Sequence, residues 1–102
     1  MQLDLVERLT LLGTLPEKGN LVTIKILRKL RESLAPTEQE IEEFGLRGTD
    51  WQVGSGQGMA EIEISETQRG IIVDAMQAAD KNKQLTVQHI SLWEKFCEDD
   101  KE

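Results

Sequence analysis

The side chains most often used for nucleophilic, acid–base or metal chemistry are scarce in this chain of 102 residues, which has one histidine and one cysteine. His89 and Cys97 are eight residues apart in a segment with helical patterning, so about 12 Å of helix rise separates them. Because that distance is too long for a shared metal ion or a nucleophile–base pair within one subunit, we predict no catalytic residue, no metal site and no cofactor. We interpret His89 as a packed histidine and Cys97 as a buried, inert thiol.

Two loops have compositions that resemble those of ligand-binding loops. Residues 80–84 resemble the start of a calcium loop, but Leu85 takes the sixth position, which needs glycine, and Ser91 the twelfth, which needs a bidentate acid. Residues 54–58 are rich in glycine, as phosphate-binding loops are, but neither a Lys-Ser or Lys-Thr pair nor a helix follows them. We interpret the first as a connecting loop and the second as a flexible hairpin tip, with ligand binding as the alternative for the second.

Charge is unevenly distributed along the chain, whose net charge is −7. Residues 1–35 carry +2 and residues 36–102 carry −9. The cationic side chains of the first part form a stripe on one predicted helix: Lys25, Arg28 and Lys29, with Arg31 at its edge. A solvated helix face would explain this stripe. The alternative is a functional stripe, which would suit docking onto an acidic region of another subunit or binding of a small anionic ligand, since arginine presents a planar fork to phosphate.

Acidic side chains gather in the second part of the chain, at residues 38–43 and 61–66. Glu40, Glu42 and Glu43 are the candidate partner-binding residues of the first cluster. Such an acidic face suits the basic groove of another protein, which it would occupy in place of nucleic acid. The simpler interpretation of the same residues is a solvated surface.

The apolar pattern predicts helices in both halves of the chain, and local capping signals mark where three of them begin. Asn20 precedes the second helix, and Thr37 with Glu40 and Ser65 with Gln68 have the form of capping boxes. The predicted helices cover residues 4–12, 20–34, 37–44, 65–79 and 86–97.

Two of these helices have sides that the pattern assigns to the core or to solvent. On the first helix, Asp4, Glu7 and Arg8 fall on the polar side. On the last, Ile90 is grouped with the inward-facing Leu92 and its apolar neighbours.

The middle of the chain has the two-residue period of strands. Trp51 and Val53 alternate with polar residues, as do Ile62 and Ile64, so we predict one β-hairpin with the glycine-rich tip between its strands. The predicted fold is α+β, mostly α, with four to five short helices in two helix-loop-helix units that flank this hairpin. As one domain, residues 1–102 divide into a helical pair with the basic stripe (1–35), a short acidic helix (36–48), the hairpin (49–64), a second helical pair (65–98) and an acidic tail (99–102).

Composition excludes several classes of protein. The chain is 38% hydrophobic and 30% charged, enough for a lean core that oligomerisation would help to complete. The acidic excess argues against binding polymeric nucleic acid, and a lone cysteine against a disulfide scaffold. No apolar run is long enough for a membrane span and no basic leader opens the sequence, so we expect a cytoplasmic protein.

Several stretches of this sequence resemble a group of small uncharacterised proteins of tailed bacteriophages and prophages. They are Glu7-Arg8-Leu9-Thr10-Leu11-Leu12, Leu15-Pro16-Glu17-Lys18-Gly19-Asn20, Thr23-Ile24-Lys25-Ile26, Leu30-Arg31-Glu32 and Leu92-Trp93-Glu94-Lys95-Phe96. The resemblance covers most of the chain except its glycine-rich middle. It implies the setting of a phage accessory protein in the cytoplasm of a bacterial host, and it implies no activity or site residue.

Together these features predict a non-enzymatic protein that acts by stoichiometric binding, as a homo-oligomer that counters a host defence. In the first hypothesis it sequesters a nucleotide signal at Lys25, Arg28 and Lys29. In the second, its acidic face inhibits a host protein by occupying a basic groove. A third possibility is a virion or assembly component whose hairpin edge pairs with other copies.

Overall fold

The computed structural model describes residues 1–47, 53, 54 and 56–98. Within these residues it has five α-helices and one two-stranded antiparallel sheet, which confirms the predicted α+β, mainly helical class. In chain order the elements are β1 (Gln2–Leu3), α1 (Leu5–Thr14), α2 (Leu21–Leu34), α3 (Glu38–Glu43), β2 (Ala60–Glu61), α4 (Glu66–Lys81), α5 (His89–Trp93) and a π-helical turn (Glu94–Glu98).

Side-chain caps begin α2, α3 and α4 where the sequence places them. The Asn20 side chain accepts a hydrogen bond from the Thr23 amide at the start of α2. Both predicted capping boxes, at the starts of α3 and α4, are fully formed. Because each cap satisfies an amide that would otherwise lack a helical partner, these residues set the helix boundaries locally.

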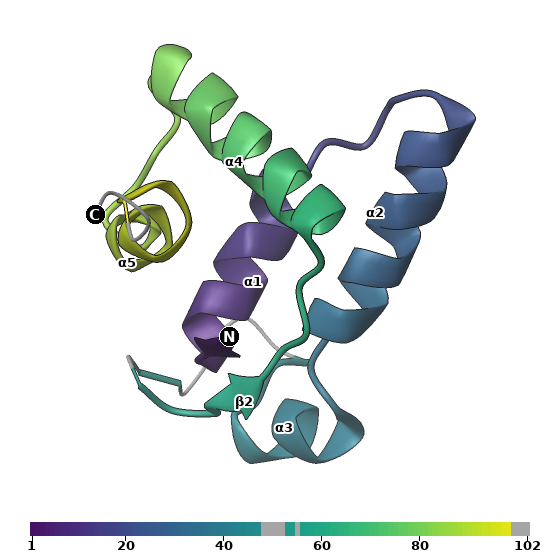
Figure 1. Ribbon diagram of the computed structural model, residues 1–102. Coiled ribbons are helices and arrows are strands. Elements are labelled where there is room, and N and C mark those ends of the chain that lie inside the picture. Colours follow the sequence, from purple (N-terminus) through teal and green to yellow (C-terminus); the bar gives the residue numbers. More distant parts are fainter. Residues whose placement is uncertain (48–52, 55, 99–102) are drawn as a thin grey trace.

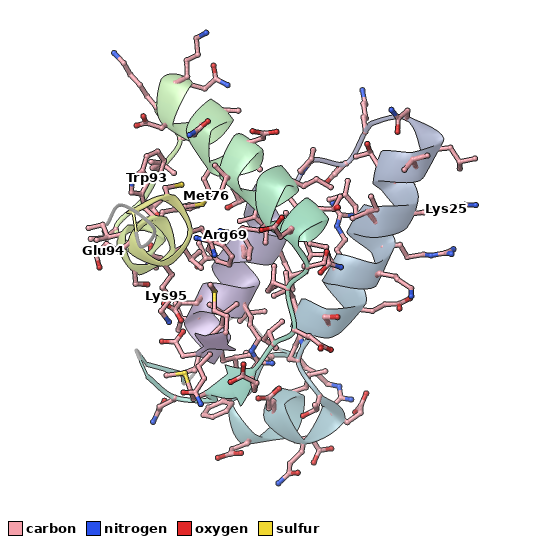
Figure 2. The ribbon with its side chains drawn as sticks, viewed as in Figure 1. Lys25, Arg69, Met76, Trp93, Glu94 and Lys95 are labelled. Atoms are coloured by element: carbon pink, nitrogen blue, oxygen red, sulfur yellow. The ribbon has the colours of Figure 1, made fainter. Side chains whose placement is uncertain are left out.

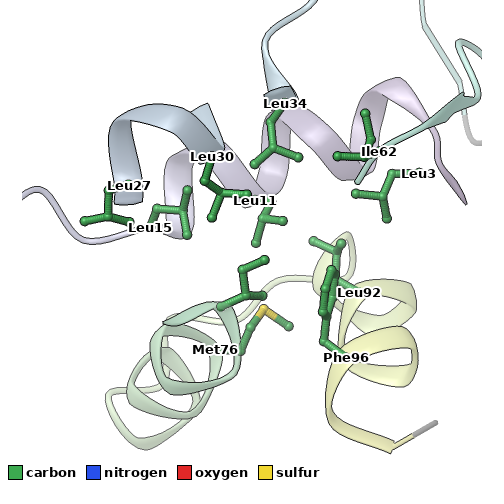
Figure 3. Packing of buried hydrophobic residues seen from close by; sticks show 11 residues of the cluster. Leu3, Leu11, Leu15, Leu27, Leu30, Leu34, Ile62, Met76, Leu92 and Phe96 are labelled. Atoms are coloured by element: carbon green, nitrogen blue, oxygen red, sulfur yellow. The ribbon is translucent and has the colours of Figure 1, made fainter. Parts of the chain in front are cut away.

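α1 lies at the centre of the fold, with α2 and α5 on opposite sides of it (Figure 1). Apolar side chains from α1, α2, α4, α5, the sheet and the π-helical turn meet in one buried cluster (Figure 3). Its members are Leu3, Leu11, Leu15, Leu27, Leu30, Leu34, Ile62, Ile72, Met76, Leu92 and Phe96. The sides of α2 and α5 that do not contribute to this cluster carry exposed side chains, among them Lys25 and Ile90.

The predicted hairpin is wrong in its pairing. The strand β2 pairs with β1 near the start of the chain, with Gln2 opposite Glu61 and Leu3 opposite Ala60. Val53 is not part of a strand, and Trp51 lies outside the described residues. The apolar alternation at residues 60–64 correctly indicated extended chain. The partner strand was predicted wrongly because a strand close in the sequence was preferred to one about sixty residues away.

The last helix also differs from its prediction. It begins at His89 rather than at residue 86, and Ile90 is 55% exposed instead of facing the core. Leu92 and Phe96 are buried as expected. Ile90 precedes Leu92 by two residues, about 200° around a helix, so the two cannot share a face.

Candidate functional site

The described surface has a groove along one face of α2, where the loop that follows α1 folds back beside the helix. It has a volume of about 360 Å³ and is lined by Pro16, Glu17, Ile24, Leu27, Arg28, Arg31, Glu32 and Ala35. The α2 residues of this lining recur at intervals of three and four, so they share one side of the helix. Leu27 is buried beneath the groove and continues into the core.

Arg31 attaches the loop to the helix. One of its Nη atoms donates a hydrogen bond to the carbonyl oxygen of Pro16 at 2.7 Å. Its Nε is buried and has no hydrogen-bond partner within the described part of the chain. Because the Nε is buried, a ligand in the groove would reach Arg31 through its Nη groups, and the exposed side chain of Arg28 lines the same groove.

The four predicted cationic residues divide between two faces of α2. Arg28 and Arg31 line the groove, whereas Lys25 and Lys29 are exposed and do not. Figure 2 shows Lys25 pointing away from the rest of the molecule. The structure thus brings two of the four together at one candidate site and places the other two on an adjacent face.

The groove has the chemistry to hold a small molecule that combines anionic and hydroxyl or amino groups. Arginine forks suit phosphate or carboxylate oxygens. Glu17 and Glu32 supply acceptors in the same lining, and Ile24, Leu27 and Pro16 supply an apolar floor. The volume is at the lower end of the range of small-molecule sites, roughly 300–1,000 Å³, which suits a ligand the size of one nucleotide.

The predicted partner-binding acids do not form one free surface. Glu40 forms a bidentate ion pair with Arg8, at 3.1 Å and 2.6 Å, and only 18% of its side chain is exposed. This bond from Arg8 holds the pKa of Glu40 below its usual value, although burial opposes the shift. Glu42 and Glu43 are exposed, and Glu42 lies 3.8 Å from Arg47. Glu40 is therefore committed to an internal contact.

A buried polar network at the start of α1 is the main feature that the sequence did not reveal. Asp4, Glu7 and Arg8 were predicted on the polar side of the helix, and all three are buried. Besides capping α1, Asp4 accepts a hydrogen bond from the Gly56 amide at 2.8 Å, and Arg8 donates one to the Gly58 carbonyl at 2.7 Å. The described residues of the glycine-rich loop are thereby attached to α1, in contrast to the predicted hairpin tip.

Glu7 belongs to the same network through a different partner. Lys95, from the π-helical turn, donates to its carboxylate at 2.8 Å. Burial raises the pKa of Glu7, but the Lys95 bond and the Asp4 backbone amide outweigh it and leave the pKa below its usual value. No spacing rule in the sequence links Glu7 to a residue as distant as Lys95. The one signal of a network in the sequence was the group of charged residues at the start of α1, Asp4, Glu7 and Arg8.

His89 is packed, as predicted, and both ring nitrogens have partners. The Thr86 amide donates to Nδ1 at 2.9 Å, and Nε2 lies 2.8 Å from the Thr14 hydroxyl. Burial lowers the pKa of His89. Cys97 is half-buried against the core cluster rather than fully buried. Over the described ranges, no three metal-ligating side chains come together, and no helix is long and apolar enough to cross a membrane.

Comparisons with protein-family models, curated proteins and solved structures found no match for this chain. The resemblance to phage proteins therefore stays a prediction.

Proposed function

We propose that the protein is a non-enzymatic binding protein that holds a nucleotide in the α2 groove. The observation that carries the proposal is that Arg28 and Arg31 line one groove that has an apolar floor. A phosphate there would gain charge-assisted hydrogen bonds from both guanidinium groups. The base would lie on the apolar floor, and the carboxylates of the lining would accept from its amino group or from the ribose.

Sequestration is the use that best suits such a site. The buried charged side chains at the start of α1 are committed to internal pairs or caps, and His89 is fully hydrogen-bonded. The protein would lower the free concentration of a signal nucleotide without converting it. In the setting that the phage resemblance implies, the protein would be an oligomer in the cytoplasm of a bacterial host, and the signal would belong to a host defence.

Two neighbouring positions on α2 test the groove. Arg28→Gln should weaken nucleotide binding by roughly tenfold to a hundredfold, the usual effect of losing a hydrogen bond to a charged group. Lys29→Gln removes the same charge one residue away, outside the groove, and should change the affinity by about twofold or less. Isothermal titration with nucleoside mono-, di- and triphosphates and cyclic dinucleotides gives both values.

Equal losses of nucleotide affinity in Arg28→Gln and Lys29→Gln would show that general positive charge, not the groove, attracts the ligand. No binding of any of these nucleotides by the wild-type protein would overturn the proposed function. Both substituted side chains are exposed, so both variants should keep the wild-type melting temperature.

A further inference from the structure

Two exposed stripes on opposite sides of the molecule have complementary composition. The α2 stripe consists of Leu21, Val22, Lys25 and Lys29, next to the groove but outside its lining. The α5 stripe consists of Val87, Ile90 and Glu94. Leu21, Lys25 and Lys29 are spaced by four residues, so they share one face of α2. Val87 precedes α5 and Glu94 follows it, and both line one shallow groove together with Ile90.

Both stripes expose apolar surface that a soluble monomer would normally bury. Leu21 and Val22 are 68% and 67% exposed, and Val87 and Ile90 are 77% and 55% exposed. Exposed apolar residues that are grouped, rather than scattered, mark interaction sites. On α5 the apolar surface continues into shallow grooves that also include Val6 of α1.

The charges beside the two apolar patches have opposite sign. Lys25 and Lys29 extend the α2 stripe, and Glu94 extends the α5 stripe. Among the described residues that line the grooves along α5, Glu94 is the exposed acidic side chain, and the lining includes no lysine or arginine. Figure 2 shows Lys25 and Glu94 pointing outward on opposite sides of the molecule.

We propose that the chain assembles head to tail, with the α2 stripe of one copy docked on the α5 stripe of the next. A second copy is the occupant that these observations favour, because it presents both the apolar patch and the cations that the α5 stripe lacks. Since the two stripes lie on opposite sides, one contact leaves a free stripe at each end of a pair. Such an interface produces rings or chains rather than a closed two-fold dimer.

Two substitutions, each of which blocks one stripe, test this arrangement. Val22→Asp places a carboxylate in the α2 stripe, where it would face Glu94 of the next copy, and Ile90→Asn replaces an apolar side chain of the α5 stripe by a neutral amide. Both side chains are exposed, so neither substitution removes a core contact. Each should weaken self-association at least about tenfold, because an apolar contact is lost and a polar group without an oppositely charged partner in the facing stripe is buried in its place.

Sedimentation velocity of each variant and of their equimolar mixture separates the possible geometries. Wild-type protein should grow beyond a dimer as its concentration rises, and each variant alone should stay monomeric. The mixture should form a dimer of one copy of each variant and grow no further, because only one intact pair of stripes remains. Any of three results would overturn the head-to-tail assembly: a wild-type protein that stays monomeric, a variant that self-associates as strongly as the wild type, or a mixture that stays monomeric.

This interface is independent of the proposed nucleotide site. Val22 is absent from the groove lining, so Val22→Asp should bind nucleotide in the groove as the wild type does. We expect Val22→Asp to lose assembly but keep the ligand, and Arg28→Gln to lose the ligand but keep assembly. This pair of results distinguishes the two proposals.

Discussion

Arg8 is a side chain that joins three separate parts of this small protein. From α1 it binds Glu40 of α3 and the carbonyl of Gly58 in the glycine-rich loop, and the residue is only 2% exposed. Its Nε has no hydrogen-bond partner in the described structure. A buried guanidinium is tolerated only while its counter-charge stays in place, so the position of α3 depends on one ion pair.

Glu40→Gln should therefore lower the free energy of unfolding by about 2–4 kcal/mol, because it leaves the Arg8 charge buried without its partner. Glu42→Gln is the matched control, since the Glu42 side chain is 76% exposed and an exposed pair contributes about 0–1 kcal/mol. Urea denaturation followed by circular dichroism measures both. Equal stabilities of the two variants would show that Arg8 is satisfied without Glu40.

The lowered pKa values of His89, Glu7 and Glu40 predict two acid-induced losses of stability. Above pH 6.5, the ordinary pKa of histidine, His89 is neutral in both states and its contribution is complete. As the pH falls below 6.5, the unfolded chain binds a proton there before the folded chain does, so stability declines. The two glutamates cause a second decline below 4.5, their ordinary value, for the same reason.

Denaturation curves over this pH range test the assignment. His89→Gln should abolish the decline between pH 6.5 and 4.5 and leave the lower one. An unchanged upper decline in that variant would assign it to another group.

At the scale of elements, the signals that act over three or four residues were readable in the sequence. Asn20, the two capping boxes and the apolar spacing of α2 predicted real helix boundaries, because each depends on residues within one helical turn. The strand partner of Ala60–Glu61 was not readable, since β1 lies about sixty residues away. The burial of Asp4, Glu7 and Arg8 depends on α3, the loop and the π-helical turn, which no periodicity in α1 encodes.

Two glycines in different elements should respond oppositely to alanine. Gly58 has a φ of +70°, and an added Cβ would lie 2.8 Å from Cβ of Leu5, so Gly58→Ala should cost about 1–3 kcal/mol and move the loop away from α1. Gly70 lies within α4 with open space around it. Gly70→Ala should stabilise the protein by about 0.5–1 kcal/mol. Thermal melts compare the two, and a neutral Gly58→Ala would contradict the close docking of the loop.

Over the whole molecule, the charge that is segregated along the sequence also lies on different surfaces. In the first third of the chain, Lys25, Arg28 and Lys29 reach the surface on α2, and the remainder of the chain carries −9. Charge segregation and the cationic stripe were predictable from the sequence. The division of that stripe into a groove pair, Arg28 and Arg31, and an outward pair, Lys25 and Lys29, required the loop at Pro16 to be placed.

Native mass spectrometry of the protein, purified gently from a bacterial lysate, tests ligand sequestration most directly, because it weighs the assembly and its bound molecules together. We expect each chain to carry an added mass of nucleotide size, which Arg28→Gln loses and Lys29→Gln retains. Chains with no added mass, which also take up none of the nucleotides supplied to them, would contradict this expectation.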